Sequence, residues 1–178
     1  VVVFLLLFYR YEITADFVAF AYLMSLLIMV FFIDIDHRIV PDELVIAGLA
    51  GSVPVFIYNI VNPFRIYGDN KWWNPLAGIL PGAGFLFLIV VFGLLLYKTD
   101  DAMGMGDVKI FIPIGIFLGW RMCIFCLFIS IILAGLASLV LLLSGKKKRK
   151  DTIPFGPFIV IGTFITIMWG LEIVNYYF

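Results

Sequence analysis

Long runs of apolar residues, separated by short polar breaks, dominate the chain. Runs near residues 14–33, 43–61, 76–97, 122–143 and 154–175 are mostly apolar, and a partial run covers 1–9. A membrane-spanning helix needs about 20 such residues. Strands of a membrane barrel would alternate apolar and polar positions, whereas these runs are continuous. The pattern therefore predicts an all-α, polytopic transmembrane bundle of about six to seven helices.

One apolar run is too short for an ordinary spanning helix. It reads "VKIFIPIGIFL" over residues 108–118 and ends at the break "GWR". A helix of this length has to be short, tilted or partly interfacial in a bilayer.

Composition supports a membrane protein. Of the 178 residues, 64% are hydrophobic and only 13% are charged, and the mean hydropathy is +1.15. A soluble domain is closer to half apolar, with about a quarter of its residues charged. Because the chain begins inside an apolar run without a methionine, we expect residues 1–178 to be one membrane domain, the C-terminal part of a longer protein.

The basic residues predict an orientation. Placing successive polar breaks on opposite sides separates two sets of basic residues. The larger set is Arg38, Lys98, Lys109, Lys146, Lys147, Lys148, Arg149 and Lys150, and the smaller is Arg10, Arg65, Lys71 and Arg121. The excess of basic residues marks the cytoplasmic side. The run "KKKRK" then acts as a topology determinant or contacts anionic lipid headgroups, and we expect no nucleic-acid partner.

Two acids stand at helix ends on this predicted cytoplasmic side. Asp34 closes the run "LMSLLIMVFFID", and Asp107 opens the run after "GMG". Taken alone, Asp107 is explained as a helix cap and the acids near Asp34 as loop residues. Gly104 and Gly106 can let a substrate backbone approach Asp107 or allow close helix packing.

Three ordered segments change this interpretation. They are "FIDIDHRIVPDELV", "GMGDVK" and "IPFGPFIVIG". In order and spacing they resemble the signatures of the type IV prepilin peptidases, a family of Gly-x-Gly-Asp aspartyl proteases. The resemblance extends from about residue 13 to 175.

The resemblance implies a membrane peptidase of the bacterial inner membrane with its active site at the cytoplasmic face. It would cut after a Gly and remove the leader from type IV prepilins or type II secretion pseudopilins. The catalytic pair of the family falls on Asp34 and Asp107. Substrate-binding or supporting roles fall on Asp36, Pro41, Asp42, Gly104, Gly106 and Lys109.

The resemblance also bears on cofactors. Many members methylate the new N-terminus with S-adenosylmethionine and carry a cytoplasmic segment, often with two Cys-x-x-Cys pairs, upstream of the helices. The printed residues contain no such segment. We therefore expect no cofactor for proteolysis, and S-adenosylmethionine only if the full-length protein methylates.

The chemistry needs only the two acids. Two carboxyl groups that share a site cannot both ionise easily, so one holds a proton while the other activates water. From the ends of their own helices we expect Asp107 to be the base and Asp34 to hold the proton. No metal site is expected, because His37 is the only histidine, and Cys123 and Cys126 lie inside an apolar run.

Three alternatives remain at this point. Archaeal preflagellin peptidases share the Gly-x-Gly-Asp signature, although "VPDEL" and "PFGPF" favour the bacterial type. Presenilin-like proteases carry their first acid within a helix after a Tyr, whereas Asp34 follows Ile33. An ion-coupled transporter would place its charges near the bilayer midplane.

Overall fold

The computed structural model describes residues 1–97, 104–144 and 153–177, and every regular element within them is helical. In chain order the elements are α1 (Val2–Tyr11), α2 (Ala15–His37), α3 (Asp42–Val61), the 3₁₀ turn η1 (Arg65–Tyr67), α4 (Asn74–Ala77), the π turn η2 (Leu80–Gly84), α5 (Phe85–Tyr97), α6 (Met105–Leu143) and α7 (Gly156–Tyr177).

Five segments are long and apolar enough to cross a membrane. They are Ala15–His37, Asp42–Val61, Asn74–Leu95, Met105–Leu143 and Gly156–Tyr176, and α1 is a shorter apolar helix. Their ends lie within a few residues of the predicted runs. The prediction of a polytopic transmembrane helical bundle is therefore confirmed.

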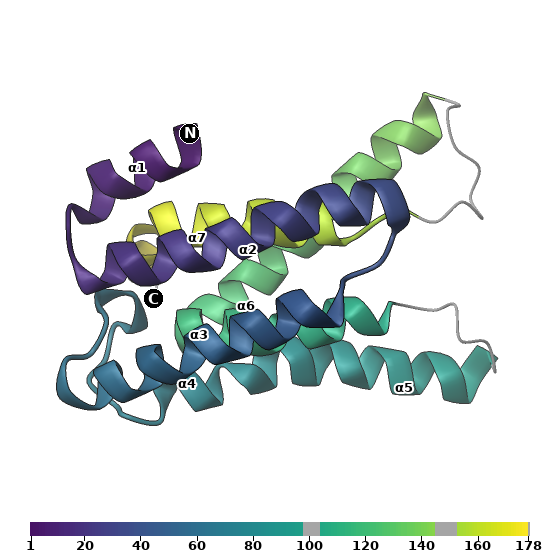
Figure 1. Cartoon of the computed structure of the whole chain (residues 1–178). Helices are drawn as coiled ribbons and strands as arrows, with labels where there is room; N and C mark the ends of the chain where they lie inside the picture. Colours follow the sequence, from purple (N-terminus) through teal and green to yellow (C-terminus); the bar gives the residue numbers. More distant parts are fainter. Residues whose placement is uncertain (98–103, 145–152, 178) are drawn as a thin grey trace.

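Local signals set the turn between α2 and α3. The N–H of Arg38, which has the left-handed φ of 57°, ends α2 by donating to the carbonyl of Asp34. Pro41 is the N-cap of α3, and Asp42 and Glu43 occupy its first turn, where acids favour the positive end of a helix. The "DIDHRIVPDE" segment thus forms a tight connection between two spanning helices, as Figure 1 shows at the right.

Helix α6 is bent sharply at Gly119, which has φ 72° and ψ 172°. In Figure 1, α6 runs from the right-hand end of the bundle toward the left and then returns to the right. The short run 108–118 and the longer run 122–143 are therefore the two halves of this element. Asn74 holds the bend, since its side-chain oxygen accepts the N–H of Trp120 at 3.1 Å.

The smaller set of basic residues lies at the opposite end of α2 from Asp34. Arg10 pairs with Glu172 of α7, Arg65 acts electrostatically on Asp16 at the start of α2, and Lys71 and Arg121 line one cavity. Of the larger set, Lys98 and residues 146–150 lie outside the described residues.

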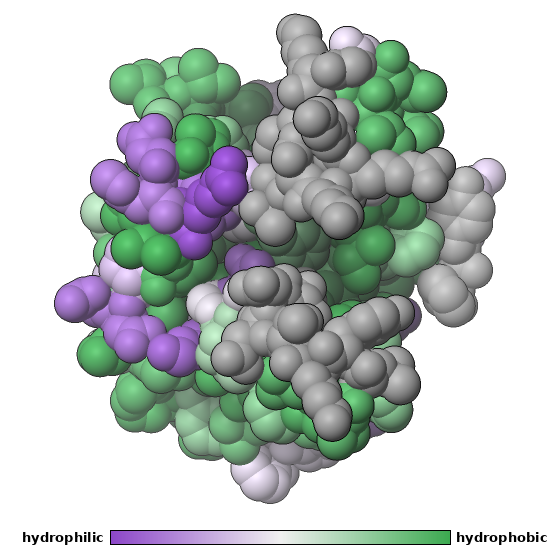
Figure 2. Space-filling view, turned by 90° about the vertical axis from the view of Figure 1, so that its right-hand side faces the viewer, coloured by the Kyte–Doolittle hydropathy of each residue, from purple (hydrophilic) through white to green (hydrophobic). Residues whose placement is uncertain are grey.

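Many large apolar side chains face outward along the helices, including Phe32, Ile46, Phe92, Phe128 and Leu139. A soluble surface rarely has contiguous apolar patches of this extent. Figure 2 faces the right-hand end of Figure 1 and shows hydrophilic residues gathered on one part of it, with hydrophobic residues around them. The outward apolar surface fits contact with lipid.

Candidate active site

Asp34 lies in the last turn of α2 with 5% of its surface exposed. Its Oδ2 atom accepts a hydrogen bond from the backbone N–H of Gly156 at 2.9 Å. Gly156 is the first residue of α7, so a distant part of the chain reaches this carboxyl group. Burial without such a donor would cost several kcal/mol, about 2–7 for a polar group.

Asp107 is the third residue of α6 and is 9% exposed. The N-cap of α6 is Gly104, and no side chain caps this helix. The explanation of Asp107 as the helix N-cap is therefore wrong, because Gly104 holds that position, and within the described residues no backbone N–H donates to the Asp107 side chain. A buried carboxyl group that serves no cap in the structure is a candidate for chemistry.

The two acids meet in one cavity of about 490 Å³. The cavity is lined by Asp34, Arg38, Ile39, Val40, Asp42, Glu43, Gly104, Met105, Gly106, Asp107 and Lys109. The carboxyl group of Asp34 is close enough to act electrostatically on that of Asp107. Two helices that are far apart in sequence thus bring both predicted acids to a single polar cavity.

The predicted supporting residues divide into two groups. Gly104, Gly106, Asp42 and Lys109 line the cavity, and the ammonium group of Lys109 pairs with Oδ1 of Asp42 at 2.7 Å. The described cavity wall does not include Asp36 or Pro41. Asp36 is exposed at the end of α2, while Pro41 begins α3.

The two glycines differ in their surroundings. A Cβ atom on Gly106 would lie 2.9 Å from the Cβ of Val40, whereas one on Gly104 would lie 3.4 Å from the nearest atom, Oδ2 of Asp107. Gly106 therefore packs tightly against the connection between α2 and α3. Gly104 borders the cavity with room beside it.

Sequence reasoning missed the contact made by Gly156. The segment "IPFGPFIVIG" resembles a family segment, but its sequence alone predicts no role for its glycine. The signal that could have found it is a Gly-Pro pair that opens an apolar helix on the predicted side of the acids, because Pro favours the first turn of a helix.

The arrangement suits acid–base chemistry on water. Two buried carboxyl groups at one cavity can share a proton, so that one accepts a proton from water while the other donates a hydrogen bond. Among the described residues, no group of three or more His, Cys, Asp or Glu side chains could hold a metal ion.

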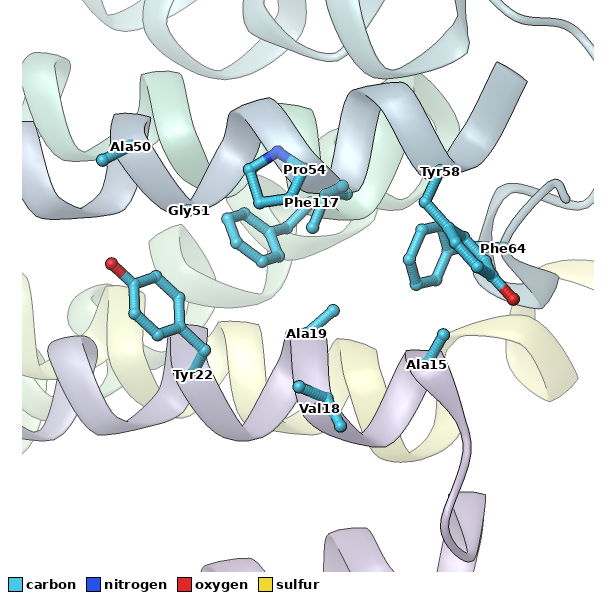
Figure 3. Close-up of a pocket in the computed structure, with 11 residues that line it drawn as sticks. Ala15, Val18, Ala19, Tyr22, Ala50, Gly51, Pro54, Tyr58, Phe64 and Phe117 are labelled. Atoms are coloured by element: carbon cyan, nitrogen blue, oxygen red, sulfur yellow. The ribbon is translucent and has the colours of Figure 1, made fainter. Parts of the chain in front are cut away.

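Another cavity, of about 640 Å³, lies between α2 and α3 toward their other ends. Figure 3 shows Tyr22, Pro54, Tyr58 and Phe117 around it. Its described wall contains no acid, and the hydroxyl of Tyr22 donates to the carbonyl of Ala47. This apolar groove carries no carboxyl group on its described wall, unlike the cavity that Asp34 and Asp107 line.

Comparison with known proteins gives several matches. The chain is 34% identical over 154 residues to the prepilin leader peptidase/N-methyltransferase of Legionella pneumophila, covering 85% of this chain and 50% of that protein. It is 28% identical over 168 residues to the protein of the same name from Bacillus subtilis (strain 168), covering 94% and 62%. No solved structure matches the chain.

The chain therefore spans about half to three fifths of the length of these two relatives. The profile of the Type IV leader peptidase family matches residues 21–139, a range that contains both acids and most of α2 and α6, the helices that hold them. On this match the chain belongs to the type IV leader peptidase family.

Proposed function

We propose that the chain is a membrane aspartyl endopeptidase that removes the leader peptide from type IV prepilins or type II secretion pseudopilins, cutting after a Gly. The observation that carries this proposal is the pair of buried acids, Asp34 and Asp107, on the wall of one cavity. The names of the relatives support the substrate class, because both are prepilin leader peptidases.

The proposed reaction uses water as the nucleophile. One carboxylate of the pair takes a proton from water while the water oxygen attacks the scissile carbonyl carbon. The other carboxyl group donates a hydrogen bond to the carbonyl oxygen as negative charge develops there. The C–N bond of the tetrahedral intermediate then breaks, and the carboxyl group that took a proton from water gives that proton to the leaving amine.

The reaction would take place at the cytoplasmic face of the bacterial inner membrane. Both acids lie where spanning helices end, which supports cleavage at a membrane surface. The cytoplasmic assignment rests on the distribution of basic residues. The substrate arrives through the lipid with its apolar helix in the bilayer and its leader at the surface.

The leaders of prepilins are basic in the family that this chain resembles, and acidic side chains supply the proposed attraction for them. Asp42 and Glu43 line the cavity, and Asp36 is exposed beside it on the last turn of α2. Opposite charge raises the local concentration of a basic segment and orients it. We assign these residues to leader binding, with Lys109 holding Asp42.

The described wall of this cavity has no aromatic side chain on which an adenine could stack, so we assign only proteolysis to it. The prediction that S-adenosylmethionine serves only if the full-length protein methylates stays a prediction.

Cleavage of a purified prepilin in detergent tests the proposal. Wild type should cut after the leader Gly, and Asp34→Asn and Asp107→Asn should each lose about 10²- to 10⁴-fold in rate, the contribution typical of general acid–base catalysis. Glu12→Gln is the matched control, because Glu12 is an exposed acid at the opposite end of α2.

Two results would contradict the proposal. Normal cleavage by both Asn variants would reduce Asp34 and Asp107 to structural acids. The peptidase function would be excluded if the folded wild-type protein cleaves neither as this chain nor within the complete protein.

A further inference from the structure

The first turn of α7 is built around one backbone donor. Four N–H groups at the start of a helix have no partner within it, those of the N-cap residue and of the first three helical residues. In α7 the first three helical residues are Gly156, Pro157 and Phe158. Pro157 has no N–H, and the N–H of Phe158 donates to the carbonyl of Phe155 at 3.0 Å. Gly156 is left, and its N–H donates to Oδ2 of Asp34 at 2.9 Å.

Only glycine fits at this position. A Cβ atom on Gly156 would lie 2.6 Å from Oδ2, 2.9 Å from Cγ and 3.1 Å from Cβ of Asp34. Any side chain would therefore push the Asp34 carboxyl group away from the N–H that binds it. The contact needs the donor and the missing side chain together.

We propose that Gly156 is a positioning residue for the peptidase reaction, whose N–H fixes Oδ2 of Asp34 and so leaves Oδ1 as the oxygen that exchanges a proton with water or substrate. This inference rests on the proposed function. An N–H that donates to Oδ2 makes that oxygen an acceptor, so a proton on Asp34 resides on Oδ1. The contact also restricts rotation of the carboxyl group.

Several charged groups act on this carboxyl group besides the Gly156 donor. Arg38 acts on Asp34 from the end of α2, and Asp107 and Lys109 face the same cavity from α6. Asp42 and Glu43 face it from α3. Several charges together therefore set how Asp34 responds to pH. A test of Gly156 has to observe the hydrogen bond between its N–H and Asp34 directly.

The amide signal of Gly156 provides that report. Only two Phe-Gly pairs occur in the chain, Phe92-Gly93 and Phe155-Gly156. Protein labelled with carbonyl ¹³C in Phe and ¹⁵N in Gly therefore gives two carbonyl-filtered amide signals in a micelle. Gly93 lies within α5 and serves as the internal reference.

We expect the amide proton of Gly156 to resonate downfield and to move with pH as Asp34 titrates, because hydrogen bonds to an ionised acceptor are shorter and stronger. Asp34→Asn should remove this pH dependence. Asp107→Asn should change the pH at which the Gly156 shift is half complete, while the Gly156 amide proton stays downfield. The Gly93 signal should stay fixed throughout. A Gly156 signal that is identical in wild type and Asp34→Asn at every pH would overturn the inference.

Kinetics test the consequence for the reaction. Gly156→Ala should lower kcat by about 10- to 100-fold, as expected for a displacement of catalytic groups by about 1 Å, with KM close to wild type and a shifted pH–rate profile. Gly170→Ala is the control on the same helix, because a Cβ there would contact Thr166 Cγ2 and Met122 Sδ at 3.1 and 3.2 Å, away from the acids.

The outcomes separate this inference from the proposed function. A folded Gly156→Ala protein with wild-type kcat and pH profile would overturn the positioning role. If Gly156→Ala does not fold, the amide signals of wild type and Asp34→Asn still decide the contact. A wild type that cleaves no prepilin overturns the proposed function, whereas a Gly156 signal that follows Asp34 would still support the contact.

Discussion

Gly104 and Gly106 form one motif in the sequence but meet different neighbours in the structure. Gly106 lies against Val40, where a methyl group has no room, and Gly104 borders the cavity beside Asp107. The sequence suggested two uses for these glycines, close packing and approach of a substrate backbone. The motif can serve both, with one use at each position. Close packing accounts for Gly106, and the role of Gly104 in substrate access stays a prediction.

Gly106→Ala should lower the free energy of unfolding by about 1–3 kcal/mol, the usual effect of overpacking. Gly104→Ala should leave stability unchanged, because the nearest atom would lie at an ordinary contact distance of 3.4 Å. Unfolding in detergent, followed by circular dichroism, measures both. If Gly106→Ala keeps wild-type stability and loses only turnover, Gly106 serves the substrate and the packing explanation is wrong.

At the same scale, the sequence predicted that Asp34 and Asp107 belong to one site but not the donor that holds Asp34. Asp34 and Asp107 stand at the ends of clear apolar runs, so their placement follows from helix boundaries. The contact between Gly156 and Asp34 joins residues 122 positions apart, and no local pattern specifies it. Asp34 lies at the C-terminus of α2 but faces the N-terminus of α7. The two helix ends act on its charge in opposite senses, so the prediction of which acid holds the proton stays a prediction.

At the scale of elements, the apolar runs gave the helices because a bilayer allows few alternatives to a helix at such length. The bend in α6 was visible only as the break "GWR". Its geometry comes from Gly119, whose positive φ suits glycine, and from Asn74, which accepts the N–H of Trp120. These contacts depend on how α4 packs on α6, so the sequence alone could not describe them.

Gly119→Ala should destabilise the protein by about 3 kcal/mol or more, since its backbone region is essentially restricted to glycine and costs another residue roughly 1–3 kcal/mol. The new Cβ would also lie 2.7 Å from Cδ1 of Tyr67. Gly135→Ala is the matched control in the same element. A Cβ there meets nothing within 4 Å, so this variant should gain roughly 0.5–1 kcal/mol. Equal melting temperatures for the two variants would contradict the assigned role of the bend.

The ion pair between α3 and α6 should contribute little to stability. The Lys109 and Asp42 side chains are 43% and 64% exposed, and exposed pairs contribute about 0–1 kcal/mol. A double-mutant cycle with Lys109→Met and Asp42→Asn should give a coupling below about 1 kcal/mol that decreases with salt. A larger coupling that resists salt would mean that the pair is shielded from solvent.

At the scale of the whole molecule, the two ends of the bundle differ in chemistry. One end carries the cavity of Asp34 and Asp107. The other end carries Arg10 of α1, Arg65 of η1, Lys71 and Arg121, with Glu172 and Asp16 beside the first two. Because α6 turns back at Gly119, both of its ends return to the side of the acids, in agreement with the predicted alternation of polar breaks (Figure 1).

Cysteine labelling measures the proposed orientation. Cys123 and Cys126 are 0% exposed, so the wild-type chain should react little with a membrane-impermeant maleimide. His37→Cys and Asn70→Cys place exposed thiols at opposite ends. We expect Asn70→Cys to react in intact spheroplasts and His37→Cys only in inverted vesicles. The reverse pattern would place the acids outside the cytoplasm.

The contact between α7 and Asp34 has a consequence for biosynthesis. Both acids have left the ribosome before the glycine that holds one of them is translated. A nascent chain that ends before residue 156 contains the catalytic pair but lacks the donor for Oδ2. Its Asp34 carboxyl group is therefore not yet oriented, however well α2 and α6 have inserted. The full catalytic rate would then be reached only when α7 enters the membrane, and a chain that stops before Gly156 would work more slowly.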